Sequence, residues 1–543
     1  MRHQLRLLKT VILALLFAAH PAWAAWHKAE TDRFIIYSDS SPDDLRVFGE
    51  TLERFHVAME FETGRRLPAP SPSNRLTIYM VGSLDDLRQV YGNPNAAVGG
   101  FYIPRAIGSV TFVPNVTTRT SGRTGFGSRV RKKSSRRPLT LTTKTVLHEY
   151  AHHFLISSSR NAMPRWLSEG SAEYFSSASF NEDGSVDIGL PNNARAWEIS
   201  QAAPVSVREL LDYELYRKNR GGRYDAFYGR SWLLYHYLRF NPDRKGQLPQ
   251  YWQAVAGGTN SLEAAKAIFG DLDTLEKELA KYGRARSLAA MRLPGGAITI
   301  GDVSTARLSN GHAAMMDVVI RSKRGVSRKA ARDLLPSAQD IAKRYPDDAH
   351  ALAALAEAEY DAGHDDAAIA AADRALAIDA TVKNALVQKG FALFRKAKGV
   401  KDPTERSAAY VAAMRPFEAL NALEVDHTQP LIFYYRSFAE RGASVPDDAK
   451  LALERATQLA PFDQELAIEV AVMRARDGDQ DIAEYLLAPV AADPHGGREA
   501  RIAQAMITYL ERTPDEKRVD LGAVTRAYDE AEAKARATGA DGG

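Results

Sequence analysis

The chain of 543 residues contains no cysteine. This absence excludes disulfides, cysteine nucleophiles, thiolate zinc sites and iron–sulfur clusters, so any metal ion must be held by His, Asp or Glu. The sequence also lacks the long apolar run, about 18 residues or more, that a membrane-spanning helix requires. With 45% hydrophobic and 25% charged residues, the composition excludes collagen-like and wholly disordered proteins. A chain of this length is expected to form about two to four domains.

The formal net charge of +4 hides an asymmetry along the chain. Residues 25–330 carry 42 Lys and Arg against 30 Asp and Glu, a net charge of +12. Residues 331–543 carry 26 basic against 37 acidic residues, a net charge of −11. Such asymmetry between two halves predicts two regions with different surfaces.

Residues 1–24 have the pattern of a secretory signal peptide. Three basic residues precede a short apolar run, and a proline and a small-x-small cleavage motif ending at Ala24 follow. An uncleaved membrane anchor is the alternative, but the run is short for about 30 Å of hydrocarbon. We therefore expect an exported protein. The lack of disulfides favours a bacterial periplasm, and secretion is the alternative location.

Hydrophobic patterns predict an α+β region over residues 25–290. The first part, 25–138, is expected to be an α/β subdomain with a small mixed sheet, and the second part, 139–290, a helical subdomain. The predicted elements of the first part are one long helix over 43–63 and strands at 33–37, 76–81, 100–103 and 109–113.

A basic loop is expected at residues 117–138, where eight Lys and Arg stand among Ser, Thr and Gly without any acid. A solvated insertion is one interpretation. The alternatives are a weak contact with anionic envelope polymer or lipid, a lid over the cleft, and docking onto the acidic repeat half. Nucleic-acid binding is not expected, because an exported protein is separated from nucleic acid and Phe126 is the loop's one aromatic residue.

The last part of the chain, 331–543, is alanine-rich and repeats a helical pattern. One pattern of small and apolar residues contains Leu352, Ala356 and Tyr360. A similar pattern begins further along the chain at Leu386. A period of about 34 residues is typical of tetratricopeptide-like repeats, which stack as helix pairs, and a non-repetitive helical bundle is the alternative. Residues 291–330, Gly-rich and strand-like around 317–321, are expected to form a connector.

One motif contains residue types that can bind a metal ion and transfer a proton. His148 and His152 lie one helical turn apart in a helical pattern, so both imidazoles project from one face and can reach one zinc ion. Glu149 follows the first histidine and can take a proton from water at the metal. A surface helix with two solvated histidines is the alternative.

A third ligand is predicted in the next helical pattern, which starts after Pro164. Glu169 lies inside this pattern, and Glu173 lies one turn further along the same helix face. Two His and one Glu, with the fourth position left to water, is the composition of a catalytic zinc site. We favour Glu169 as the ligand, with Glu173 as the lesser candidate or as the partner that orients a ligand histidine.

The motif His-Glu-x-x-His followed by Trp-Leu-Ser-Glu-Gly resembles the gluzincins, the thermolysin and aminopeptidase N class of zinc metallopeptidases. It is most similar to the bacterial peptidase MA-like proteins, several of which are fused to tetratricopeptide repeats. The resemblance implies a gluzincin-like domain over about residues 30–290, with His148, His152 and Glu169 binding one Zn²⁺ and Glu149 as the general base.

Two further positions follow from this resemblance. The segment 224–238 is similar to the helix whose tyrosine hydrogen-bonds the developing oxyanion, which implies a catalytic role for Tyr228, with Tyr224 as the next choice. Ordinary core packing is the alternative, and it is the interpretation we favour for His153 and His236. The glycine-rich strand near 99–103 lacks the Glu with which aminopeptidases capture a free amine, so an endopeptidase is favoured.

The sequence therefore predicts an exported zinc-dependent peptidase that hydrolyses peptide bonds with a metal-activated water. Its partners would be a peptide or protein substrate and, through the repeats, a further protein. The alternative is a non-catalytic envelope scaffold that uses the helical repeats for protein interaction.

Overall fold

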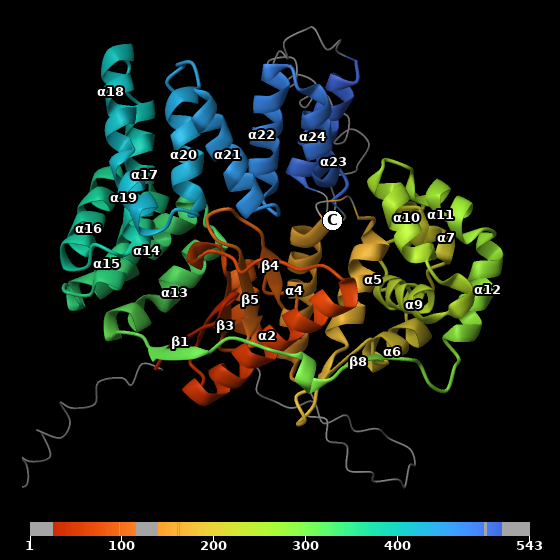
Figure 1. Cartoon of the computed structure of the whole chain (residues 1–543). Helices are drawn as coiled ribbons and strands as arrows, with labels where there is room; N and C mark the ends of the chain where they lie inside the picture. Colours follow the sequence, from red (N-terminus) through yellow and green to blue (C-terminus); the bar gives the residue numbers. More distant parts are fainter. Residues whose placement is uncertain are drawn as a thin grey trace, which may run out of the picture.

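The computed structural model describes residues 25–96, 98–115, 139–159, 161, 163–493 and 497–512. The predicted signal peptide, the basic loop 117–138 and the end of the predicted repeats, 513–543, lie outside the described residues. Figure 1 shows a central sheet, a group of helices on one side of it and a long array of helices that arches over it.

The central sheet has six strands in the order β4-β5-β3-β2-β1-β9. β2, β3 and β5 are parallel, whereas β4, β1 and β9 pair antiparallel with their neighbours. Helix α2 begins at the Ser41 cap and packs its apolar face on the sheet. These elements are β1 (His27–Glu30), β2 (Phe34–Ser38), α2 (Pro42–Thr63), η1 (Pro72–Asn74), β3 (Leu76–Val81), α3 (Leu84–Tyr91), β4 (Phe101–Ile103), β5 (Val110–Pro114) and β9 (Ser304–Arg307).

The predicted strands correspond to β2 to β5, with bounds that differ only at the strand ends. The two remaining strands, β1 and β9, were not predicted. They are short, and every residue of β9 is exposed, so neither carries the alternation of apolar and polar residues that marks a strand in sequence. Both become strands because they complete the hydrogen bonding beside β2.

The second group is helical and carries one small three-stranded sheet, ordered β6-β7-β8. Its central pair is α5 and α9, which pack closely against each other, and α4 packs against α5. The elements are α4 (Leu141–Ser159), α5 (Arg165–Ser176), β6 (Ser179–Phe180), β7 (Val186–Ile188), α6 (Asn193–Gln201), α7 (Val207–Leu211), α8 (Tyr213–Arg220), α9 (Phe227–Phe240), η2 (Pro242–Arg244), α10 (Gln247–Ala256), α11 (Ser261–Phe269), α12 (Leu272–Tyr282), β8 (Met291–Leu293) and η3 (Gly295–Ala297).

The rest of the described chain is a helical repeat region, in which successive helices pack as neighbouring pairs. α17 repeats the sequence pattern of α15, as predicted. The helices are α13 (Asn310–Arg324), α14 (Arg328–Arg344), α15 (Ala349–Ala362), α16 (Asp365–Ile378), α17 (Lys383–Lys398), α18 (Pro403–Ala413), α19 (Arg415–Leu423), α20 (Thr428–Ala439), α21 (Asp447–Leu459), α22 (Gln464–Asp477), α23 (Gln480–Ala491) and α24 (Arg498–Leu510).

Within the expected connector 291–330, the strand-like prediction for 317–321 is wrong. Residues 317–321, predicted as strand-like, lie inside α13, which packs on α14 and α15 and so extends the repeat region back to Asn310. The β-branched run favours a strand by propensity alone. The helix forms because Ser309 caps it and because Met315 and Val318 are buried against the next helices.

The repeat region is docked onto the α/β part by hydrogen bonds at several points. Asp463 accepts a hydrogen bond from the backbone N–H of Ala106 at 2.6 Å. Glu424 accepts hydrogen bonds from the backbone and hydroxyl of Ser73, and it also pairs with Lys383. Burial raises the pKa of Glu424, but these partners outweigh it and lower the pKa to about 2. The ionised carboxylate thus joins the two regions at neutral pH.

In the described part of the chain, no helix combines the length and the apolar character that a membrane crossing needs.

Candidate metal centre

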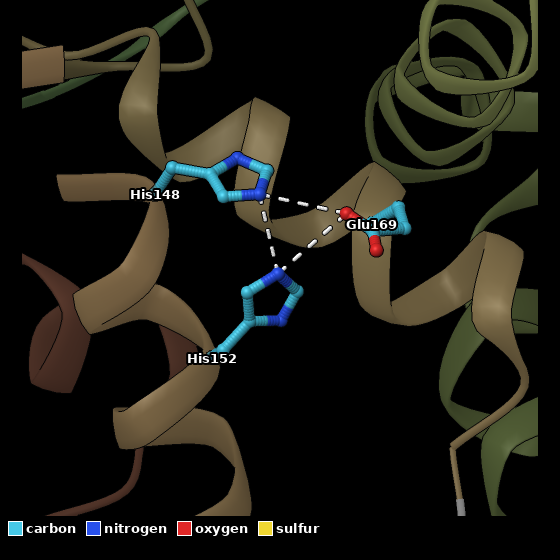
Figure 2. Close-up of side chains that lie close together, drawn as sticks. All are labelled: His148, His152 and Glu169. Atoms are coloured by element: carbon cyan, nitrogen blue, oxygen red, sulfur yellow. Dashed lines mark hydrogen bonds and ion pairs between the residues drawn. The ribbon is translucent and has the colours of Figure 1, made fainter. Parts of the chain in front are cut away.

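Two neighbouring helices place the predicted ligands. α4 buries one apolar face in the core, and His148 and His152 lie one turn apart beside that face. α5 starts at Arg165, directly after its N-cap residue Pro164, and is buried along almost its whole length. Because α4 and α5 pack against each other, Glu169 of α5 faces the two histidines of α4 (Figure 2).

Three side-chain atoms converge at one point. The Nε2 atoms of His148 and His152 lie 3.2 Å apart, and Oε2 of Glu169 lies 3.5 Å from the first and 3.6 Å from the second. Glu169 is only 1% exposed, and His152 is 8% exposed. Among the residues that the structure describes, this is the one group of His, Asp or Glu with the compactness of a metal site.

These residues fit a zinc ion. Ligand atoms at about 2.0–2.1 Å from a tetrahedral zinc ion lie about 3.3–3.4 Å from one another. The three separations here, 3.2, 3.5 and 3.6 Å, are close to that value. The donor set of two imidazoles and one carboxylate suits zinc, and three protein ligands leave a coordination position open for chemistry.

The outer nitrogens of both histidines have hydrogen-bonding partners that orient the rings. Nδ1 of His148 lies 3.4 Å from Oε1 of Glu173, and Nδ1 of His152 lies 3.1 Å from the Ser168 hydroxyl. Glu173 is itself held by Arg195 at 2.5 Å and by Asn192 at 3.0 Å. Such partners fix the tautomer of a metal-binding histidine. Glu173 therefore stands behind His148, and Glu169 is the carboxylate at the converging point.

The electrostatic field at this point favours a cation. Burial opposes protonation of His148, but hydrogen bonds to Glu169 and Glu173 raise its pKa well above the ordinary value. Burial raises the pKa of Glu169, yet the two histidines lower it well below the usual range. For Glu173, burial is likewise outweighed by His148 and Arg195, and the pKa falls to about 2. Two carboxylates thus surround His148, and the same field attracts a metal ion.

Glu149 lies next to the converging point on the cleft side. Its side chain lines a cleft of about 810 Å³ together with His152 and Ser168. Burial raises the pKa of Glu149, whereas His148 and His152 act in the opposite direction. A carboxylate in this position can exchange a proton with a molecule in the cleft.

Tyr228 lies in the first turn of α9, and Tyr224 precedes this helix. Burial and the charge of Glu169 raise the pKa of Tyr228, while Arg165 opposes that rise, and the ring lies 5.0 Å from the Arg195 guanidinium. Tyr228 does not line the cleft beside Glu149, so its catalytic role stays a prediction. Tyr224 is 64% exposed.

The predicted packing histidines have structural partners. Nδ1 of His153 contacts the Tyr102 hydroxyl at 2.7 Å, and His236 contacts Tyr282 and the backbone oxygen of Gly189. The sequence interpretation overlooked Tyr102, whose side chain lines the cleft. It also overlooked Arg195 and Asn192, because these residues of the next helical segment reach Glu173 only through the fold around α6.

The glycine of the Trp-Leu-Ser-Glu-Gly segment, Gly170, lies where another helix comes very close. A Cβ at this position would lie 2.5 Å from the backbone oxygen of Ser231 on α9, closer than any real contact. Close packing of α5 on α9 therefore needs glycine here, and that packing sets the position of the adjacent Glu169.

We expect Gly170→Ala to lower the free energy of unfolding by about 1–3 kcal/mol, because α5 and α9 must separate. Urea unfolding followed by circular dichroism measures this. Gly296→Ala is the control, since a Cβ there meets nothing within 4 Å. Equal stability of the two variants would contradict the packing argument.

We expect Glu173→Gln to weaken zinc affinity by about tenfold to a hundredfold, because His148 loses the carboxylate that orients it. Competition with a chromophoric chelator measures the affinity. Glu182→Gln, an exposed carboxylate on the β6–β7 hairpin, is the matched control and should leave the affinity unchanged.

The fold and site define a chain that combines a buried His-His-Glu centre with a helical repeat region. A family model described as a protein of unknown function, DUF1570, matches residues 142–256, which include α4, α5 and α9. No curated protein matches the chain.

Three solved structures, two of them described as tetratricopeptide repeat proteins, are similar to parts of the chain. MamA of Desulfovibrio magneticus RS-1 is 16% identical over 38% of this chain and 99% of that one, with a TM-score of 0.26. A tetratricopeptide repeat protein of Thermus thermophilus is 14% identical over 36% and 94%, with a TM-score of 0.30. One of Parabacteroides merdae is 12% identical over 53% and 91%, with a TM-score of 0.30.

These TM-scores are too low to establish a shared fold, and the helical repeat region is defined by the helix pairs of this chain itself. Stacked helix pairs create extended surfaces that bind other proteins. None of the matches described above is with a zinc peptidase, so the gluzincin resemblance stays a prediction.

Proposed function

We propose that the chain is a zinc-dependent hydrolase of peptide bonds. The observation that carries this proposal is the convergence of His148, His152 and Glu169 at separations of 3.2 to 3.6 Å, with Glu149 beside them in a cleft. A purely structural zinc site would close all four coordination positions with side chains, whereas this group offers three.

The chain's own residues have distinct tasks in this proposal. His148, His152 and Glu169 would hold a zinc ion, which would supply Lewis acidity towards the scissile carbonyl and lower the pKa of a bound water. Glu149 would accept a proton from the attacking water as the water oxygen bonds to the carbonyl carbon. The same carboxyl then delivers the proton to the amine nitrogen as the C–N bond breaks, so the products are a carboxylic acid, which loses its remaining proton to solvent, and an amine. Glu173 and Ser168 keep the rings of His148 and His152 in a fixed orientation during the reaction.

An endopeptidase is the form of the activity that the site favours. β4 lies at the edge of the six-stranded sheet and carries Tyr102, which lines the cleft. The unpaired side of an edge strand can hydrogen-bond an extended peptide. β4 carries no carboxylate that would capture a free amino terminus.

Metal content and hydrolysis together test the proposal. We expect the purified chain to contain about one zinc ion by plasma mass spectrometry and to cleave unfolded casein. Chelation should abolish the cleavage, and added zinc should restore it. A chain that binds zinc with this geometry yet cleaves neither casein nor a mixed peptide library would contradict the proposal.

A second candidate function is an envelope scaffold that binds other proteins through its helical repeats. The repeat region favours it, because α13 to α24 form a long surface of paired helices. Crosslinking in cells that carry either the native chain or the Glu149→Gln variant separates the two functions. A scaffold keeps its partners and its phenotype in the variant, whereas a peptidase loses the phenotype and accumulates uncleaved substrate.

A further inference from the structure

The cleft beside Glu149 lies between two regions that are distant in sequence. The α/β and helical parts contribute Tyr102, Glu149 and His152 to its lining. The repeat region contributes residues mainly of α20, α22 and α23, together with Phe462 just before α22 and single residues of α17, α21 and α24. Figure 1 shows α20 to α24 above β4 and the end of α4. The repeats thus form the wall that faces the metal centre across the cleft.

This wall is fixed relative to the metal centre. Phe462 packs on His153, the neighbour of a ligand, with ring centroids 4.9 Å apart. Asp463 accepts a hydrogen bond from Ala106, just beyond β4, and Thr428 of α20 donates one to the Ala106 carbonyl. A recruiting module on a flexible tether would not make these contacts. The distance from the wall to Glu149 is therefore set by the fold.

The wall combines apolar and acidic groups. Its apolar part includes Ile432, Leu466 and Tyr485, and Tyr485 keeps 62% of its surface exposed. Its charged residues are four acids and one base, and the base, Arg436, is paired with Glu469 through two hydrogen bonds of 3.0 and 2.6 Å. The four acids of the wall are Asp463, Glu465, Asp493 and Glu499.

We propose that α20, α22 and α23 form the specificity wall of the substrate cleft and select peptide segments that carry basic side chains beside an apolar residue. This inference rests on the proposed peptidase function. The apolar patch around Tyr485 accepts the apolar residue. The acidic residues of the wall, Glu465 foremost because it is exposed, accept the basic one. In this inference, the negatively charged repeat region selects substrates by their charge.

Peptide binding tests the inference without any turnover. The probes are two short fluorescein-labelled peptides with the same Leu-Ala-Phe centre, flanked by lysine in one and by glutamate in the other. Fluorescence anisotropy with the full metal-free chain should show about tenfold tighter binding of the lysine peptide, and added salt should reduce the difference. Glu465→Lys should lower the affinity for the lysine peptide by about fivefold and should not lower the affinity for the glutamate peptide. Tyr485→Ala should lower the affinity for both peptides by about fivefold.

Two matched variants serve as controls. Asp481→Lys reverses another exposed acid in the first turn of its helix, as Glu465→Lys does, but lies outside the cleft. Ile482→Ala truncates an exposed apolar side chain on α23 that also lies outside it. Equal binding of the two peptides, or an Asp481→Lys effect as large as that of Glu465→Lys, would overturn the inference.

The zinc-loaded chain separates this inference from the proposed function. If the lysine peptide binds selectively but neither peptide nor casein is cleaved, the peptidase function fails while the wall retains its role in binding. If both peptides are cleaved and Glu465→Lys and Tyr485→Ala change neither affinity nor kcat/KM, the inference fails while the peptidase function stands.

Discussion

Glu149→Gln is expected to lower kcat for casein cleavage by about a thousandfold or more while zinc content stays at about one ion per chain. General acid–base catalysis contributes about a hundredfold to ten-thousandfold to a rate, and Glu149 is asked to act both as base and as acid. Glutamine has the same shape but cannot take up the proton. Because Glu149 is not one of the three converging side chains, its replacement leaves the metal ligands in place.

The Glu149 experiment combines a rate assay on casein with metal analysis of the same sample. Glu182→Gln is again the control for loss of one carboxylate, and it should retain full activity. Turnover by Glu149→Gln within tenfold of the native rate would show that another group is the base. Loss of zinc from Glu149→Gln would instead show that this carboxylate is a ligand.

Glu169→Gln is expected to lower zinc affinity by about a hundredfold to a thousandfold and to abolish cleavage at limiting zinc. The apparent binding free energy of a structural zinc site, about 10–16 kcal/mol at pH 7, is shared among four ligands, so one ligand corresponds to roughly 2.5–4 kcal/mol. A neutral amide keeps the shape of the side chain but is a poor zinc donor. Isothermal competition with a chelator at fixed pH measures the change.

Comparison with Glu173→Gln decides which carboxylate is the ligand. Glu169 lies at the converging point of Figure 2, whereas Glu173 contacts the outer nitrogen of His148, so the loss should be at least about tenfold larger for Glu169→Gln. A larger loss for Glu173→Gln would move the third ligand one turn along α5. Thermal unfolding of both variants without metal shows whether either change acts through stability.

The arrangement of the candidate metal ligands was largely predictable because it depends on short-range patterns. The one-turn spacing of His148 and His152 determines that both lie on one helix face. The Pro164 helix start and the position of Glu169 predicted a second helix with an inward carboxylate. Arg195, Asn192 and Ser231 could not be placed in this way, because their contacts to α5 depend on how α6 and α9 pack against it.

The fold likewise contains elements that the sequence predicts and elements that depend on tertiary packing. The buried strands β2, β3 and β5 and helix α2 follow from their apolar patterns. The strand-like interpretation of 317–321 was wrong because local β propensity is weaker than burial of Met315 and Val318 in the repeat core. β9, in which every residue is exposed, carries no alternating pattern and forms through its pairing with β1.

The sequence by itself determined which side chains are the candidate metal ligands, the lack of any thiolate ligand and the helical repeat, because each depends on residue type and on spacing within one or two helices. Only the tertiary structure decided what the site faces. The contacts of Ala106 with Thr428 and Asp463 join segments that lie far apart in the sequence, and no local pattern encodes such pairings. They place the acidic repeats as one wall of the cleft that Glu149 and His152 also line.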